Sequence, residues 1–289
     1  MKLEKMFKYP DQWELKNGYF IKKDHYVCPT VFCDDMQQAH FDEAGSFWYK
    51  VREDICLALM KKYFVTDRQT DRQTDAPLIS DIGGGNGVLA KELSASGFNM
   101  LLMEPSEIAC RNAQKLGIKN IVCASINDED FNDNSFGDCL LLDVIEHIKD
   151  DDYFLKILNK KMQAGKFIII SAPAFECLTS SHDKLLGHFR RYNTKTLCEK
   201  LSNNGFKCIK AGYFFSYLFF AVLLVFGLGE KIGFLKNETL AEDGAHRGHT
   251  SNKVISLLAK FVGKIEMFCL LKGIKIPVGS SLVVLAKKI

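Results

Sequence analysis

The chain of 289 residues has no strong excess of either charge and no block of five or more consecutive lysines and arginines. It has 38 basic and 35 acidic side chains, which give a formal net charge of +3. Such a balance provides no electrostatic basis for nucleic-acid binding, and we expect none. The opening stretch MKLEKMFKYPDQWELK also lacks the apolar run of a signal peptide, which predicts a cytoplasmic protein.

The ten cysteines include no pair with the two-residue spacing typical of zinc ligands. Cys28 and Cys33 come nearest to it, and no second pair accompanies them, so no zinc site is expected there. Most cysteines stand singly, and we interpret them as buried thiols of a reducing compartment. Those inside apolar runs are Cys56, Cys123, Cys139, Cys208 and Cys269.

A glycine-rich turn between two regular elements is the most informative stretch. Residues 78–87 read LISDIGGGNG, a short apolar run with Asp81 at its end and then a turn, and the helical stretch VLAKELSASG follows. Glycines at 83, 85 and 87 let the backbone adopt conformations closed to other residues and let a ligand approach the main chain. The first amides of the helix suit an anionic or strongly polar group.

This turn differs from that of dinucleotide-binding proteins. Their motif is GxGxxG, but Val88 stands where the third glycine would be. The chain has DxGxGxG instead, which disfavours a nicotinamide oxidoreductase. A second apolar run, residues 98–103, leads directly to Glu104, which is placed to accept hydrogen bonds from the two hydroxyls of a ribose.

The DxGxGxG turn, Glu104 and the later stretch LLLDVIEHI together resemble the class I S-adenosylmethionine-dependent methyltransferases. The resemblance covers about residues 81–289. It implies an α/β, Rossmann-like fold, with a seven-stranded, mostly parallel sheet, flanking helices, an N-terminal helical cap and a late helical insertion. It also implies S-adenosylmethionine as cofactor and S-adenosylhomocysteine as product. The expected cofactor-binding residues are Asp81, Gly83, Gly85, Gly87, Glu104, Pro105, Ser125, Ile126, Asp143, Val144 and Arg52.

Within this resemblance the glycines approach the methionine part of the cofactor and Glu104 holds the ribose. Related enzymes often bind the adenine amino group with an acidic residue after the third strand, NIVCA here, but Ser125 occupies that place. Its hydroxyl still accepts one hydrogen bond, and Ile126 is expected to pack on the adenine ring. Arg52, in a stretch FWYKVR that resembles the N-terminal helix of related proteins, is a candidate for the methionine carboxylate. The alternative is an exposed, solvated arginine.

The fourth predicted strand, residues 139–142, runs into Asp143, Val144 and the sequence IEH. Because strand ends line the binding crevice of an open α/β sheet, this stretch should border the reactive end of the cofactor. The pattern resembles that of quinone-biosynthesis and related small-molecule methyltransferases. His147 is either a general base or a cap of the following helix, predicted over about residues 151–162.

After the fifth strand, KFIIISAP, comes the stretch with the most chemically active side chains, FECLTSSHDKLLGHFRRYNTKTL. Its HDxxxGHxRRY pattern resembles a bacterial group of methyltransferases associated with envelope polysaccharide and other secondary pathways. We expect His182 or His188 to remove the acceptor's proton. Arg190 or Arg191 would pair with a substrate phosphate or carboxylate. The predicted substrate-binding residues of this loop are Asp183, Arg190, Arg191 and Tyr192.

A structural role for this loop is the alternative. Arg191 and Tyr192 would then tie the loop to the domain, and one histidine would be a partner of a helix N-terminus. No metal is expected, because the six-residue spacing of His182 and His188 matches no standard ligand pair.

Two domains are predicted. Residues 1–75 should form an irregular N-terminal cap with a helix over about residues 41–64 and the polar repeat TDRQTDRQTD as a flexible loop, and residues 76–289 the methyltransferase domain. A helical hairpin, about residues 211–272, is inserted before the last strand. It is a lid buried on the domain, a surface helix pair at the membrane interface, or a membrane span, in decreasing order of expectation.

We therefore expect a methyltransferase that acts on a small-molecule acceptor, by O-methylation of a saccharide or a related envelope or secondary metabolite. The acceptor would carry a phosphate or carboxylate, or be linked to a lipid. A membrane-associated quinone or lipid methyltransferase, peripheral at the inner membrane face, is one alternative. A protein that binds S-adenosylmethionine without catalysis is another.

Overall fold

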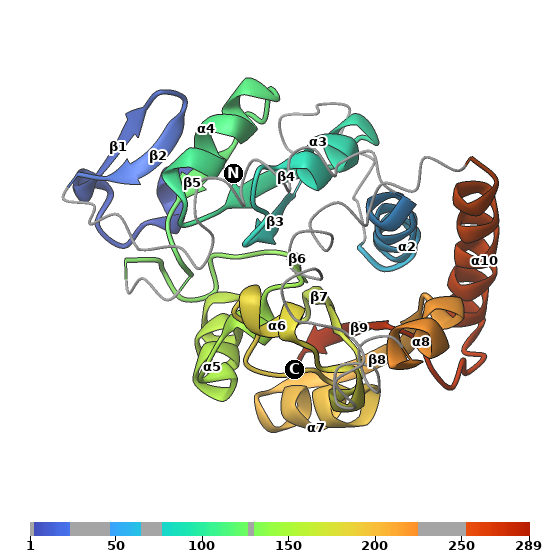
Figure 1. Cartoon of the computed structure of the whole chain (residues 1–289). Helices are drawn as coiled ribbons and strands as arrows, with labels where there is room; N and C mark the ends of the chain where they lie inside the picture. Colours follow the sequence, from blue (N-terminus) through green and yellow to red (C-terminus); the bar gives the residue numbers. More distant parts are fainter. Residues whose placement is uncertain (1–2, 24–46, 65–76, 127–129, 225–252) are drawn as a thin grey trace.

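The computed structural model describes residues 3–23, 47–64, 77–126, 130–224 and 253–289. These residues form one nine-stranded sheet with the order β1-β2-β5-β4-β3-β6-β7-β9-β8 (Figure 1). β2 to β7 pair in parallel where they are neighbours, whereas β9 runs antiparallel to both β7 and β8. The strands are β1 (Trp13–Lys16), β2 (Tyr19–Lys22), β3 (Leu78–Ile82), β4 (Asn99–Met103), β5 (Ile121–Cys123), β6 (Cys139–Leu142), β7 (Phe167–Pro173), β8 (Phe206–Phe214) and β9 (Ser281–Lys288).

The seven strands from β3 to β9 are those predicted, and the Rossmann-like fold is confirmed. The first two strands were missed. They form an antiparallel hairpin whose two-residue turn, Asn17 and Gly18, has φ values of 50° and 86°, the geometry for which Asn-Gly is the strongest short signal. This hairpin extends the sheet through β5, so residues 13–22 are part of the main sheet and not of an irregular cap.

Helices cover both faces of the sheet. They are α2 (Phe47–Tyr63), α3 (Val88–Ala95), α4 (Glu107–Lys115), α5 (Asp151–Lys161), α6 (Ser181–Leu185), α7 (Thr194–Asn203), α8 (Ser216–Val222) and α10 (Lys253–Lys272), with short 3-10 turns η1 (Leu3–Met6), η2 (Pro10–Gln12), η5 (Ile145–His147) and η6 (Glu176–Leu178). The predicted helix over 41–64 is described from residue 47 onward, and the TDRQ repeat lies outside the described residues.

The buried side chains divide into two clusters, one on each face of the sheet. In β4, Leu101 and Met103 belong to the cluster that includes side chains of α5 and α7, whereas Met100 and Leu102 belong to the cluster that includes side chains of α2, α3 and α4. Successive side chains of a strand point to opposite faces, so a strand buried on both sides is apolar throughout. This explains the unbroken runs that predicted β3 to β7.

Cysteines follow the prediction in part. Cys56, Cys123 and Cys139 are buried free thiols, and Cys269 is a partly exposed one. The expectation for Cys208 was wrong, because the structure joins it to Cys198 in a disulfide between α7 and β8. Cys28 and Cys33 lie outside the described residues.

The late insertion begins four residues after its predicted start, because residues 211–214 belong to β8. Its described helices are α8 and α10. α10 packs against α2 and β8 at the end of the molecule opposite the β1–β2 hairpin (Figure 1). Among the helices that the structure describes, none is long and apolar enough to cross a membrane.

A buried carboxylate joins α10 to the start of α8. Glu266 is 3% exposed and accepts hydrogen bonds from the backbone N–H groups of Phe215 and Ser216, at 2.9 and 2.8 Å, and from the Ser216 hydroxyl at 2.6 Å. Phe215 has a positive φ of 58°. Glu266 therefore satisfies the amides that a helix N-terminus leaves without partners.

Replacing Glu266 by alanine should lower the free energy of unfolding by roughly 2–4 kcal/mol, because two amides lose their acceptor inside the protein. Urea denaturation followed by circular dichroism measures the change. Glu266→Gln keeps one carbonyl acceptor and should lose less. The exposed Glu92 is the matched control, and Glu92→Ala should leave stability within about 0.5 kcal/mol of the parent.

Candidate active site

Several positions of the turn after β3 require glycine. Gly83, Gly85 and Gly87 have φ values of 71°, 55° and 76°. A Cβ on Gly83 would lie 2.7 Å from the Val144 side chain. A Cβ on Gly84, which the sequence motif did not single out, would overlap Asp81 and Leu102.

Gly85 differs from the other glycines of the turn, because a Cβ there would have no atom within 4 Å. Its φ requires glycine, but the space beside it is open. A ligand can therefore reach the backbone at Gly85, as the motif predicted.

Glu104 joins this turn to the end of β4. One carboxylate oxygen accepts a hydrogen bond from the Gly85 N–H at 3.0 Å, and the other accepts one from the Ser106 N–H at 2.9 Å. The residue is 6% exposed. Burial raises the pKa of Glu104, and the two amides oppose that rise. Each oxygen keeps a second lone pair for a further donor.

Asp81 is the predicted cofactor residue on β3, and it is deeply buried. It is 2% exposed, and its Oδ2 atom has no hydrogen-bond partner. Burial raises the pKa of Asp81 to about 7, with a small further rise from Glu104 and an opposing effect of Arg52. A buried carboxylate oxygen without a donor is costly, so this atom is suited to a positively charged ligand group.

Two other predicted residues, Arg52 and Asp143, are brought together. Arg52 on α2 forms an ion pair with Asp143 Oδ2, while Asp143 Oδ1 accepts from the Ser171 hydroxyl at 2.8 Å. The Arg52 Nε atom is buried and has no partner in the described structure. Arg52 is thus held by Asp143 rather than solvated, and its Nε donor is available to a ligand carboxylate.

The predicted adenine side is less distinctive. Ile126 is buried in the core, whereas Ser125 and Pro105 are half-buried. These residues follow β5 and β4, so they lie at the same edge of the sheet as the glycine turn. Their roles stay predictions.

Asp183 organises the loop after β7. Its carboxylate is 1% exposed and accepts from Arg191 Nε and Nη2, each at 2.9 Å, and from the Ser180 N–H and hydroxyl at 2.9 and 3.1 Å. It also contacts His188 Nδ1 at 2.8 Å. His188 and Arg191 hold the pKa of Asp183 well below its usual range despite burial.

The second half of the loop is bound to α5 by a hydrogen bond and an ion pair. The Tyr192 hydroxyl donates to Asp151 Oδ2 at 2.7 Å, and Arg190 pairs with Asp151 Oδ1 at 2.7 Å. Arg190 also donates to the Lys149 carbonyl at 2.6 Å. The structural role predicted as an alternative for Arg191 and Tyr192 thus describes what both residues do in this structure.

His147 and His188 lie side by side although they are far apart in the sequence. Their ring centroids are 4.7 Å apart, and the ring planes meet at 76°. The Phe189 N–H donates to the Glu146 carbonyl at 2.8 Å, which brings the loop onto η5. His182, on α6, is not part of this pair. The alternative role of His147 as a helix cap is wrong, because Asp150 caps α5 by accepting from the Tyr153 N–H.

Glu146 was part of the predicted motif but was not singled out. It is 1% exposed, and its Oε2 atom has no partner. Burial, and then the charge of Asp143, raises its pKa well above the usual value. An acidic residue in a 3-10 turn at the end of a buried strand was the signal that could have identified it.

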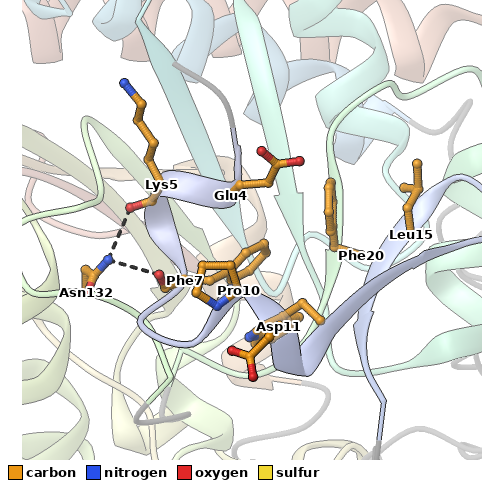
Figure 2. Close-up of a pocket in the computed structure, with 9 residues that line it drawn as sticks. Glu4, Lys5, Phe7, Pro10, Asp11, Leu15, Phe20 and Asn132 are labelled. Atoms are coloured by element: carbon orange, nitrogen blue, oxygen red, sulfur yellow. Dashed lines mark hydrogen bonds between the residues drawn. The ribbon is translucent and has the colours of Figure 1, made fainter.

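A separate pocket of about 880 Å³ lies at the N-terminal hairpin, away from these residues. It is lined by η1, η2 and β1–β2, and Asn132 donates to the carbonyls of Lys5 and Phe7 beside it (Figure 2). It contains none of the predicted site residues.

The site fits S-adenosylmethionine on three features. Asp81 offers an unpartnered carboxylate oxygen for an ammonium, Gly85 leaves open space at the backbone, and Glu104 retains lone pairs for ribose hydroxyls. The fold is that of a class I S-adenosylmethionine-dependent methyltransferase domain. Residues 80–170 match the family described as "Methyltransferase domain", and the predicted class is confirmed by this match.

Individual relatives are distant. A ubiquinone biosynthesis O-methyltransferase of Rickettsia canadensis (strain McKiel) is 25% identical over 150 residues, which cover 48% of this chain and 63% of that protein. A phosphoethanolamine N-methyltransferase 2 of Haemonchus contortus, solved with S-adenosyl-L-methionine, superposes with a TM-score of 0.54 at 19% identity, over 92% of this chain and 61% of that one. A second structure of that enzyme has a TM-score of 0.53 at 17% identity, over 90% and 59%. The structural similarity establishes the shared fold.

Gly85→Ala should weaken binding of S-adenosylhomocysteine, because its methyl group enters the open space at the backbone. It should also cost about 1–2 kcal/mol of stability, since alanine is strained at positive φ. Gly97 is the matched control, with a φ of 91° and nothing within 4 Å of its added Cβ. Calorimetry should show weaker binding for Gly85→Ala alone, although both variants lose similar stability. Equal affinity for the two variants would contradict the role of Gly85.

Asp81 should make cofactor affinity depend on pH. Its raised pKa of about 7 means that the folded protein holds the proton below pH 7. Stability of the free protein should therefore fall as pH rises from the ordinary carboxyl range through about 7. Affinity for the ammonium-bearing S-adenosylhomocysteine should rise roughly tenfold between about pH 6 and pH 7.5, as the carboxylate forms.

The variant Asp81→Asn tests this dependence, because its side chain does not titrate. It should bind S-adenosylhomocysteine more weakly at pH 7.5 and with little change over the same interval. A wild-type affinity that is flat with pH would exclude Asp81 from contact with the ammonium.

Proposed function

We propose that the protein transfers the methyl group of S-adenosylmethionine to a hydroxyl of a small-molecule acceptor. The observation that supports this proposal is that the predicted cofactor residues and two histidines lie at the same edge of the sheet. The glycine turn after β3 and Glu104 after β4 adjoin η5 after β6, where His147 meets His188 of the loop after β7. A cofactor site and a pair of imidazoles are thus neighbours.

The chain's own residues would bind and orient the cofactor. Asp81 receives the ammonium, Glu104 the ribose hydroxyls, and Arg52 Nε the carboxylate. The cofactor supplies a methyl group already activated by positively charged sulfur. Much of the rate increase can therefore come from holding the acceptor oxygen in line with the methyl carbon.

The acceptor loses its proton beside His147 and His188, the two of the three predicted histidines that lie together. Asp183 fixes the His188 ring through Nδ1, in the manner of the carboxylate that orients a catalytic histidine. Ser180 and Arg191 in turn hold Asp183.

A neutral, hydroxyl-rich acceptor such as a saccharide or a related envelope or secondary metabolite fits these contacts best. Arg190 and Arg191 were predicted to pair with a substrate phosphate or carboxylate. Both guanidinium groups already bind carboxylates of the protein, Asp151 and Asp183. Removing either one from its buried partner would be unfavourable.

A lipid-soluble acceptor, such as a quinone, is the second candidate. It is favoured by α10, which exposes apolar side chains along one face and lysines beside them. This arrangement is typical of helices that lie in an anionic membrane interface. The relative from Rickettsia, a ubiquinone biosynthesis O-methyltransferase, supports the same acceptor class. The exposed apolar residues are Leu257, Leu258, Phe261, Ile265 and Phe268, and the exposed lysines are Lys260, Lys264 and Lys272.

Transfer of radiolabelled methyl groups into a bacterial small-molecule extract tests the proposal. Partition of the products between water and an organic solvent separates the two acceptor classes. Label in the aqueous phase supports the saccharide class, and label in the organic phase supports the quinone or lipid class. Binding of S-adenosylhomocysteine without any label transfer would support a non-catalytic binding protein.

Glu104→Ala should weaken S-adenosylhomocysteine binding by about 1–3 kcal/mol, because a charged acceptor of ribose hydroxyls is lost. Label transfer at limiting cofactor should fall in proportion. Calorimetry gives the affinity, with Glu92→Ala on the exposed face of α3 as control. Unchanged affinity in Glu104→Ala would remove Glu104 from the cofactor site.

A further inference from the structure

Three metal-ligating side chains converge where η5 meets the loop after β7. Glu146, His147 and His188 each offer one ligand atom, and these atoms lie within 4.8 Å of one another. Two of the residues are adjacent on η5, and His188 comes from the loop between α6 and α7. The sequence prediction of no metal considered only the spacing of His182 and His188, and not this set of three residues.

The Glu146 carboxyl group is the feature that points to a ligand. It is 1% exposed, and its Oε2 atom is buried without a hydrogen-bond partner. Arg52 and Arg191 exert only long-range effects on it. An unpartnered carboxylate oxygen inside a protein is expensive, and a bound cation would compensate that cost.

His188 has the support usual for a metal-binding histidine. Its Nδ1 atom lies 2.8 Å from Asp183 Oδ1. With Nδ1 donating its proton to this carboxylate, Nε2 keeps the lone pair that a metal needs. Arg191 and Ser180 hold Asp183 in place, so the ring orientation is set by a buried network.

We propose that Glu146, His147 and His188 bind one divalent transition-metal ion. Two imidazoles and one carboxylate suit zinc, iron or manganese, whereas magnesium and calcium prefer sites of oxygen atoms alone. Ligands of tetrahedral zinc lie about 3.3 Å apart. The three ligand atoms lie within 4.8 Å of one another, so binding the ion would bring them closer by at most about 1.5 Å.

The role of the ion rests on the proposed function. An acceptor hydroxyl bound to it would have a lowered pKa and lose its proton to water. The resulting alkoxide oxygen forms a bond to the methyl carbon, and the carbon–sulfur bond breaks with its electron pair on sulfur. The products are a methyl ether and neutral S-adenosylhomocysteine. The ion thus takes the place of direct proton removal by His188, whose Nε2 is a ligand.

Zinc binding to the full chain tests the site without an acceptor. The protein is freed of metal with a chelator and titrated with Zn²⁺ by calorimetry, and its metal content is measured after gel filtration. We expect one tightly bound ion in the wild type and a loss of at least about tenfold in affinity in Glu146→Gln and in His188→Gln. His182→Gln is the matched control from the same loop and should keep wild-type affinity.

Spectroscopy of the wild type tests the ligand set without any variant, so the test does not depend on whether a variant folds. Co²⁺ in place of zinc should show bands of nitrogen and oxygen ligands and no thiolate band, since the set contains no cysteine. Zinc should also raise the melting temperature of the wild type, but not that of Glu146→Gln. No bound ion, a thiolate-bound ion, or equal losses in all three variants would overturn the site.

These outcomes are separable from those of the proposed function. S-adenosylhomocysteine binding should persist in Glu146→Gln, because Glu146 is not among the cofactor residues. If zinc binds as described but no methyl transfer occurs, the metal site stands and the function fails. If label transfer persists in the chelator-treated protein, the function stands and the role of the ion fails.

Discussion

The Glu104 carboxylate connects the end of β4 to the glycine turn after β3, the two segments of the candidate cofactor site. Glu104 stands at the end of β4, yet one of its oxygens accepts the N–H of Gly85, in the turn after β3. The open space beside Gly85 and the free lone pairs of Glu104 therefore face the same place. Glycine is needed because of φ at Gly85, and because of packing at Gly83 and Gly84. The turn is thus shaped by its neighbours before any ligand arrives.

A second network, of hydrogen bonds and ion pairs, holds the loop after β7. Asp183 binds Arg191, Ser180 and His188, while Asp151 binds Arg190 and Tyr192. Six polar residues of one loop are thereby used to fix its shape: Ser180, Asp183, His188, Arg190, Arg191 and Tyr192. The loop does not present a row of free charges to a substrate. It presents His188, held at a fixed orientation beside His147, and this arrangement concentrates the chemistry of the loop at one pair of imidazoles.

The fold was largely predictable because both faces of the sheet are covered, so most residues of β3 to β7 are apolar and buried. The hairpin at Asn17 and Gly18 was missed because its strands have four residues each and β1 is exposed at three of them. The positions of the predicted cofactor residues were predictable because these residues follow strand ends along the chain, and their roles stay predictions. The pairing of Arg52 with Asp143 and of His147 with His188 was not, because these contacts span 91 and 41 positions and depend on how loops fold back. Sequence spacing carries no information on such distances.

Three carboxyl groups are buried along one edge of the sheet: Asp81 on β3, Glu104 after β4 and Glu146 after β6. Burial raises the pKa of each. Asp81 and Glu146 each keep an oxygen without a donor in the described structure. A fold selected for stability alone would replace such groups with apolar ones. Their retention at a single edge is accounted for if each receives a polar or cationic partner, namely an ammonium, a pair of hydroxyls and a metal ion. The desolvation penalty of these carboxyl groups destabilises the free protein. A ligand that pairs with them removes this penalty, which favours binding.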